Sequence, residues 1–225
     1  MKQTQTVMAL AASITLSQGA TITYSIDNIL TEYTPESTAP WISVTMVDIT
    51  NRATDPSATK DYVGITIESS LDQPQEYVSV INIALDEKFA DLETGLGSVD
   101  VGGFQAPTAT VGNNMFQGGV AGTVGSTFDL QLEFSKSGSN GGAERFNWSD
   151  VYTIVVGFDG ADIMTAETLG LIITGDPDPF TVAHIQGIGD GGELSAWTTS
   201  IPEPSTILLS ALSTLGLIAR RKRVK

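Results

Sequence analysis

The stretch Ser126–Phe134, with the sequence STFDLQLEF, decides the fold class of this chain. Its apolar and polar residues alternate strictly: Phe128, Leu130, Leu132 and Phe134 on one side, and Thr127, Asp129, Gln131 and Glu133 on the other. Successive side chains of a β-strand point to opposite faces of its sheet. The alternation therefore predicts a strand with one face in an apolar core and the other in water.

The same period of two recurs on both sides of this strand. Tyr62–Glu68 places Val63, Ile65 and Ile67 on one face, and Tyr77–Leu85 places Tyr77, Ser79, Ile81, Ile83 and Leu85 on one face. Val151–Phe158 is almost wholly apolar, which predicts a central strand covered on both sides. Further strands are expected at Thr21–Ile26, Trp41–Ile49, Leu171–Thr174, Thr181–Ile188 and Leu194–Ile201.

The segments between these strands are short or rich in turn residues. We expect one helical turn at Asp86–Leu92 and a short helix capped by Asp162. We expect a long decorated loop or thin edge strands at Gly95–Gly125. Many short strands without a long amphipathic helix predict a sandwich or barrel and disfavour a parallel α/β fold. We expect residues 21–200 to form one antiparallel all-β sandwich, of jelly-roll or immunoglobulin-like topology.

Charge and cysteine content exclude several classes of function. The chain has 26 acidic and 11 basic residues, and its formal net charge is −15. Residues 21–201 alone carry 25 acidic and 5 basic residues, which gives −20. Such a surface repels phosphate backbones, so we expect no nucleic-acid partner. The absence of cysteine excludes disulfides, thiolate metal sites and a cysteine nucleophile.

The N-terminus is typical of a signal peptide. Lys2 forms a thin charged region, Val7–Leu16 is apolar, and small residues follow up to Ala20. This order predicts export and removal of residues 1–20.

Three acidic, turn-forming loops are candidates for binding calcium. Their oxygen ligands would come from Asp159 and Asp162, from Asp176 and Asp178, and from Asp190 and Glu193. None of these loops matches the twelve-residue EF-hand, and Asp and Gly are also the ordinary residues of turns. Calcium is the one cofactor that the sequence suggests.

The sequence predicts no catalytic residues. A glycosidase needs two carboxylates facing each other across a cleft, and 25 acids in one domain produce such pairs by chance. His184 is the single histidine, and on a strand it is expected to be a hydrogen-bonded structural residue. We therefore expect a non-enzymatic protein.

The three tryptophans of the chain, Trp41, Trp148 and Trp197, could together form a platform on which sugars stack. Trp41 and Trp148 have apolar flanks and are predicted to lie in the core. Trp197 lies in a Ser/Thr-rich edge segment and is the best candidate for an exposed glycan contact.

The last 25 residues contain three features in a fixed order. Pro202-Glu203-Pro204 comes first, Ser205–Ala219 is an apolar segment expected to form a single hydrophobic helix, and residues 220–225 are the basic tail, with Arg220, Arg221, Lys222 and Arg223. This order closely resembles the PEP-CTERM sorting signal of Gram-negative bacteria. The body is similar, more loosely, to other PEP-CTERM passenger domains in its Ala183–Ile188 stretch and in Trp197.

The resemblance implies export, transient anchoring in the inner membrane and cleavage by an exosortase near Pro202–Pro204. It also implies delivery to the cell surface or the exopolysaccharide matrix. Ser205–Ala219 is shorter than the about 20 residues that span a bilayer, while the basic end matches a cytoplasmic C-terminus. We expect a structural or adhesive protein associated with exopolysaccharide; the alternatives are a carbohydrate-binding module and, less favoured, a polysaccharide hydrolase.

Overall fold

The computed structural model describes residues 21–85, 89, 91–94, 96–117, 127–137, 144–170 and 181–200. The expected signal peptide at 1–20, the expected strand at 171–174 and the sorting tail at 201–225 lie outside the described residues, as does most of 86–92.

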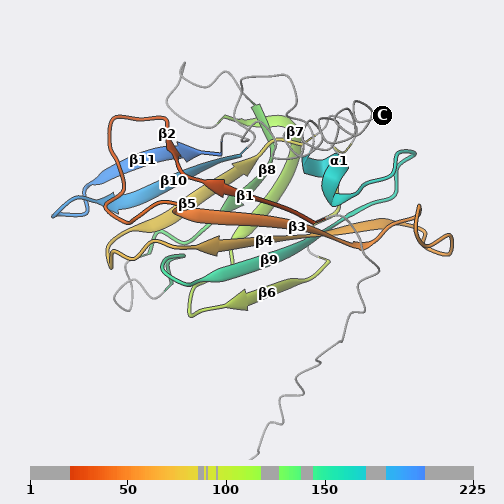
Figure 1. Cartoon of the computed structure of the whole chain (residues 1–225), viewed down its shortest axis with the longest axis horizontal. Coiled ribbons are helices and arrows are strands. Elements are labelled where there is room, and N and C mark those ends of the chain that lie inside the picture. The colour runs from red at the N-terminus through yellow and green to blue at the C-terminus, as the bar shows by residue number, and fades with distance from the viewer. Residues whose placement is uncertain are drawn as a thin grey trace, which may run out of the picture.

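Two antiparallel sheets make up the body of the protein (Figure 1). The five-stranded sheet has the order β1 (Thr21–Ile26), β3 (Ile42–Thr50), β4 (Asp61–Ser69), β9 (Val151–Phe158) and β6 (Ser98–Val101). The six-stranded sheet has the order β2 (Asn28–Ile29), β11 (Leu194–Thr199), β10 (Thr181–Ile188), β5 (Tyr77–Ile83), β8 (Thr127–Glu133) and β7 (Thr108–Gln117). The predicted all-β sandwich is confirmed.

The glycine-rich region Gly95–Gly125 supplies an edge strand to each sheet. β6 ends the five-stranded sheet beside β9, and β7 ends the six-stranded sheet beside β8. β9 is therefore second from an edge, and alternate residues on its outer face are only half-buried. The prediction of a central strand covered on both sides was wrong, because β6 is short and nothing among the described elements covers that face.

The inner faces of the two sheets form one hydrophobic core. Val63, Ile65 and Ile67 of β4 are fully buried, as their alternation predicted. The same holds for the apolar residues of the Ser126–Phe134 stretch, each at most 2% exposed: Phe128, Leu130, Leu132 and Phe134. Period-two patterning thus identified the core-facing residues of both strands.

An aromatic cluster fills one part of this core, and three of its four rings come from outside the strands. The Phe134 and Phe146 rings stack with centroids 4.5 Å apart, and Phe104 meets Phe146 edge-on at 4.9 Å. Tyr152 of β9 lies 6.2 Å from Phe134. Aromatic pairs at these separations stabilise a core beyond the area they bury.

The short helix α1 (Ala166–Gly170) begins later than expected. Its cap is Thr165, whose Oγ1 accepts a hydrogen bond of 3.0 Å from the Thr168 amide, while Thr168 Oγ1 accepts one from the Thr165 amide. The prediction that Asp162 caps the helix was wrong. Such reciprocal bonds satisfy amides that would otherwise lack partners at a helix start.

We expect Phe146→Ala to lower the free energy of unfolding by about 3–5 kcal/mol, because it leaves a cavity beside two aromatic rings. Trp148→Ala removes a side chain that is 65% exposed and should change stability by about 0.5 kcal/mol or less. Urea unfolding followed by circular dichroism measures both. Equal losses in the two variants would contradict this account of the core.

Candidate functional site

A β-bulge in β5 decides which side chains reach the outer face of the six-stranded sheet. His184 pairs with Val80 and Ile185 pairs with Val78, so Ser79 has no partner in the β5–β10 register. One extra residue in a strand shifts every following side chain to the opposite face.

The bulge overturns part of the predicted face of this strand. Ile81 and Ile83 lie in the core as expected, but Val78 joins them there. Tyr77 and Ser79 lie instead on the outer face, where they bond to side chains of β10. The period-two pattern predicted that Tyr77 and Ser79 share one face with Ile81, Ile83 and Leu85. That prediction was wrong, because it assumed a strand without a bulge.

The side chains that this bulge brings together form a continuous line, which we call the outer-face row: Trp197 of β11, His184 and Gln186 of β10, Tyr77 of β5, and Arg145. Trp197 and His184 are directly paired across the strands, and their rings stack with centroids 4.6 Å apart at 14°. The backbone around Arg145 reaches the sheet through a bridge between Phe146 and Val78.

Hydrogen bonds and a cation–π contact continue the row beyond the stacked pair. Gln186 Nε2 lies 3.3 Å from His184 Nδ1, and the Tyr77 hydroxyl donates to Gln186 Oε1 at 2.6 Å. The Arg145 guanidinium carbon lies 4.2 Å from the centroid of the Tyr77 ring. Every neighbouring pair in the row is therefore in contact, which fixes the spacing of its polar groups.

The imidazole of His184 is held as a neutral, oriented ring. Burial lowers the pKa of His184, and the positive charge of Lys136 lowers it further. Ser79 Oγ lies 3.0 Å from Nδ1, so the histidine is hydrogen-bonded as the sequence predicted. An uncharged ring stacked on an indole presents a mainly apolar surface with polar atoms at its rim.

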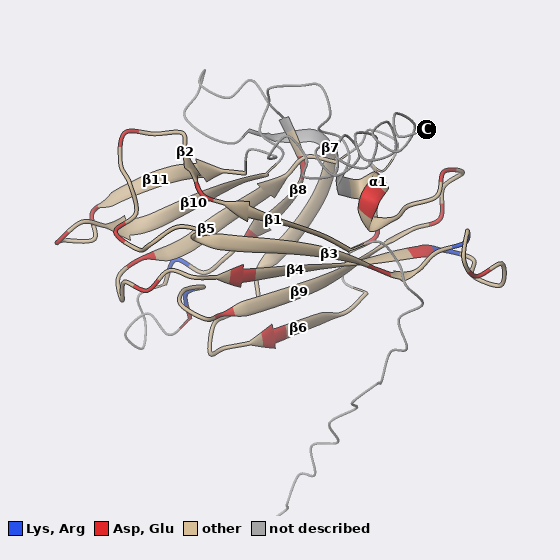
Figure 2. Ribbon diagram, in the orientation of Figure 1, with Lys and Arg blue, Asp and Glu red and all other residues tan. Residues whose placement is uncertain are grey.

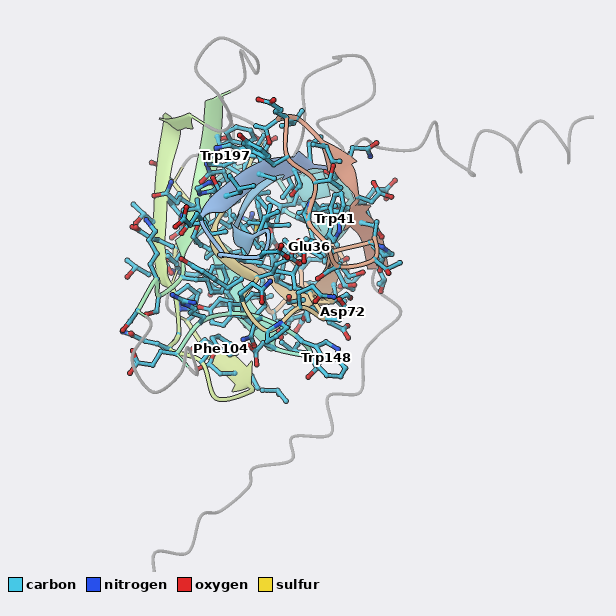
Figure 3. All side chains as sticks on the ribbon, turned by 90° about the vertical axis from the view of Figure 1, so that its left-hand side faces the viewer. Glu36, Trp41, Asp72, Phe104, Trp148 and Trp197 are labelled. Atoms are coloured by element: carbon cyan, nitrogen blue, oxygen red, sulfur yellow. The ribbon has the colours of Figure 1, made fainter. Side chains whose placement is uncertain are left out.

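The three tryptophans do not form a common platform, and Figure 3 shows them apart from one another. Trp41 is buried as predicted, and its Nε1 donates to the Ser37 carbonyl at 2.8 Å. Trp148 is 65% exposed, so its predicted place in the core was wrong. It occupies the turn before β9, where Ser149 has a positive φ of 58°. Trp197 is half-buried against His184.

The first calcium candidate loop is held by an arginine. The Arg52 guanidinium donates to the carbonyl oxygens of Gly160 and Asp162, at 2.7 and 2.5 Å. The exposed Asp159 carboxylate lies 3.7 Å from Lys60 Nζ. These two carbonyl oxygens of the loop therefore already accept from a cation of the protein.

Of the other calcium candidates, Asp190 and Glu193 lie in the described part of the chain. Asp190 and Glu193 are exposed in the β10–β11 turn, while Asp176 and Asp178 lie outside the described residues. Within the part of the chain that the structure describes, no three acidic or histidine side chains are grouped closely enough to hold a metal ion.

The acidic side chains buried among the described residues all accept hydrogen bonds from the main chain. They are Asp48, Asp61, Glu76, Asp129 and Asp150, and each accepts at least one hydrogen bond from a main-chain amide. Asp129 was predicted to face water, but it is 4% exposed and accepts from the Leu85 amide at 2.8 Å. A carboxylate that bonds to an amide satisfies a loop group that would otherwise lack a partner.

Asp61 is the most heavily used of these acids. It is fully buried and accepts from the Arg52 side chain at 2.8 Å and from the amides of Arg52 and Met164 at 2.6 and 2.8 Å. Burial alone would raise the pKa of Asp61, but the bonds from Arg52 and the two amides outweigh it and lower the pKa.

Comparisons with known proteins identify the C-terminal segment. Residues 200–223 match the PEP-CTERM protein-sorting motif. No curated protein and no solved structure matches the chain. Among the residues that the structure describes, no helix is long and apolar enough to cross a membrane. The motif residues Pro202–Pro204, the apolar segment Ser205–Ala219 and the basic residues from Arg220 onward lie outside that part of the chain.

Most of the outer-face row was missed by the sequence analysis. The sequence predicts a glycan contact at Trp197 and a structural role for His184. It places Tyr77 on the face of Ile81 and Ile83, which is not the face where Tyr77 lies. One local signal was available: His184 and Gln186 alternate with the core residues Ala183 and Ile185, which indicates a polar outer face. Arg145 follows a Gly/Ser-rich segment and carries no such signal.

We expect Asp61→Ala to lower the free energy of unfolding by about 3 kcal/mol at pH 7, because Arg52 and two amides lose their acceptor. The lowered pKa means that the stabilisation is present above the unfolded-state pKa, about 4, and is lost as the pH falls through the folded-state value. The difference from wild type should therefore shrink on acidification. Denaturant unfolding between pH 7 and 2 measures it.

Asp159→Ala, at an exposed carboxylate in the segment between β9 and α1, is the matched control and should change stability by about 0.5 kcal/mol or less. A constant difference between wild type and Asp61→Ala over the whole pH range would contradict the assignment to the carboxylate.

Proposed function

We propose that this protein is an exported, non-enzymatic component of the cell surface and the exopolysaccharide matrix, and that its body binds polysaccharide through the outer-face row. The PEP-CTERM motif at 200–223 implies export, cell-surface sorting and processing by an exosortase. Delivery into the matrix, transient anchoring in the inner membrane and a Gram-negative host belong to the proposal.

The stacked Trp197–His184 pair is the observation that carries the binding proposal. Pyranose rings have an apolar face of C–H groups and a rim of hydroxyls, so they bind to flat aromatic surfaces bordered by hydrogen-bonding groups. The two rings stack face to face, so a sugar would stack on the indole face that points away from the imidazole. Gln186 and the Tyr77 hydroxyl border the stacked pair. Three of these four side chains are half-buried, which leaves part of each open to a ligand.

The buried carboxylates support a binding role rather than hydrolysis. A glycosidase uses one carboxyl group as an acid and a second as a base or nucleophile. All five buried acids of the described chain hold main-chain amides, an arrangement that serves stability. Hydrolysis of polysaccharide therefore remains the less favoured alternative.

We expect Trp197→Ala to weaken polysaccharide binding about tenfold or more, which corresponds to about 1.4 kcal/mol. Trp148→Ala is the matched control, since it removes a tryptophan that is 65% exposed and lies away from the row (Figure 3). A glycan array and affinity electrophoresis with the host's exopolysaccharide provide the measurement, and circular dichroism verifies folding. Undiminished binding by Trp197→Ala, or no glycan binding by wild type, would overturn the proposal.

Sorting is tested on the mature protein from its native host. We expect mass spectrometry of the surface fraction to find a C-terminus near Pro202–Pro204, without residues 220–225, when the exosortase is present. In an exosortase deletion strain, the tail should be retained and the protein should stay with the inner membrane. Intact tails on surface protein from both strains would contradict processing at the motif.

A further inference from the structure

Basic residues are scarce in this body, and those that the structure describes occur in two places. Residues 21–200 contain five of them, Arg52, Lys60, Lys88, Lys136 and Arg145, against 25 acidic residues. Figure 2 shows those that the structure describes in two groups, toward opposite ends of the sheets. Arg52 and Lys60 form one group and are paired with the carboxylates of Asp61 and Glu93, at 2.8 and 2.6 Å.

Arg145, in the other group, has no such partner. Among the residues that the structure describes, no carboxylate lies within salt-bridge distance of its guanidinium. Among these described residues its buried Nε has no hydrogen-bond partner, and the guanidinium makes one hydrogen bond, from Nη2 to the Lys136 carbonyl, which is long at 3.5 Å. In a chain with more than twice as many acids as bases, an arginine without a carboxylate is an unusual arrangement.

The Tyr77 ring holds Arg145 in place without satisfying its donors. A guanidinium stacked on an aromatic face keeps its N–H groups in the plane of the fork, where they can bind a carboxylate in a bidentate manner. Tyr77 is itself fixed by its hydroxyl bond to Gln186. The donors of Arg145 are thus positioned at the end of the row opposite to Trp197.

The acids near this end do not cancel the charge of Arg145. Glu133 is paired with Lys136 at 3.3 Å, and the buried Glu76 and Asp150 accept from main-chain amides. The half-exposed Glu144 side chain precedes Arg145 but makes no ion pair with it. More distant surface acids are screened beyond about 8 Å at physiological ionic strength.

We propose that Arg145 binds the carboxylate of an acidic sugar, so that the ligand of the outer-face row is a carboxylate-bearing polysaccharide. This inference rests on the proposed function and specifies the class of its ligand. One sugar ring of the ligand stacks on the Trp197–His184 pair. Another sugar of the same polysaccharide carries the carboxylate, and the polysaccharide lies along the row. Uronic acid residues are the common sugars with this chemistry.

The test compares acidic polymers with their neutral forms. Alginate and polygalacturonate are each used before and after carboxyl reduction, with EDTA present to prevent gelation by calcium. We expect wild type to bind at least one acidic polymer about tenfold or more tightly than its reduced form, as for a hydrogen bond between charged groups. Equal affinities for the acidic and reduced forms, or tighter binding of the reduced forms, would overturn the inference.

Arg145→Met keeps the apolar stem over Tyr77 and removes the charge. We expect it to bind the acidic polymer as weakly as wild type binds the reduced one, with the affinity for the reduced polymer unchanged. Lys60→Met is the matched control, because it removes one positive charge at the other end of the sheets and should leave both affinities unchanged. Arg145→Lys should fall between wild type and Arg145→Met, since it retains charge without the planar fork.

The outcomes separate this inference from the proposed function. If Trp197→Ala loses binding to both forms while Arg145→Met loses none, the row binds polysaccharide but Arg145 does not recognise a carboxylate. If wild type binds neither form of either polymer, nor any other glycan, both proposals fail. Should Arg145→Met not fold, the preference of wild type between acidic and reduced polymers decides alone.

Discussion

Bonds between buried carboxylates and loop amides are the constraint on which this sandwich depends. The chain passes repeatedly from one sheet to the other, and each crossing leaves main-chain N–H groups without a ladder partner. Asp61 joins the loop after β3 to the segment before α1, and Glu76 holds the amides of Glu36 and Ser37. An ionised carboxylate accepts several such bonds strongly. The acidity of the body therefore has a structural component in addition to a solvated surface.

The six-stranded sheet contributes its inner face to the core and its outer face to the candidate site. The extra residue of β5, Ser79, decides which side chains of that strand lie on each face. Without the bulge at Ser79, Tyr77 would point into the core and Val78 would point outward. With it, Tyr77 reaches both Gln186 and Arg145, so the row extends from β11 across β10 and β5. Bulges are common where a strand must redirect a side chain toward a functional surface.

Location and binding are determined by separate parts of this molecule. The segment 200–223 contains the sorting information in its local order of motif, apolar run and basic end. The body contributes an acidic surface, together with Arg145, whose guanidinium has no carboxylate partner among the described residues. An otherwise repulsive surface gives that arginine its selectivity, because few other places on the described body would attract an anionic sugar.

The sequence alone determined the strands β3, β4, β5, β8, β9 and β10, the core faces of β4 and β8, and the sorting tail, because each depends on local order: a period of two or a short motif. Only the tertiary structure decided the strand order, the burial of Asp129, the exposure of Trp148 and the outer-face row. The row joins Tyr77 to Gln186, which are 109 positions apart in the chain, and Ser79 bonds to His184 across 105 positions. Their contact depends on the register between strands, and a bulge changes that register without altering local composition.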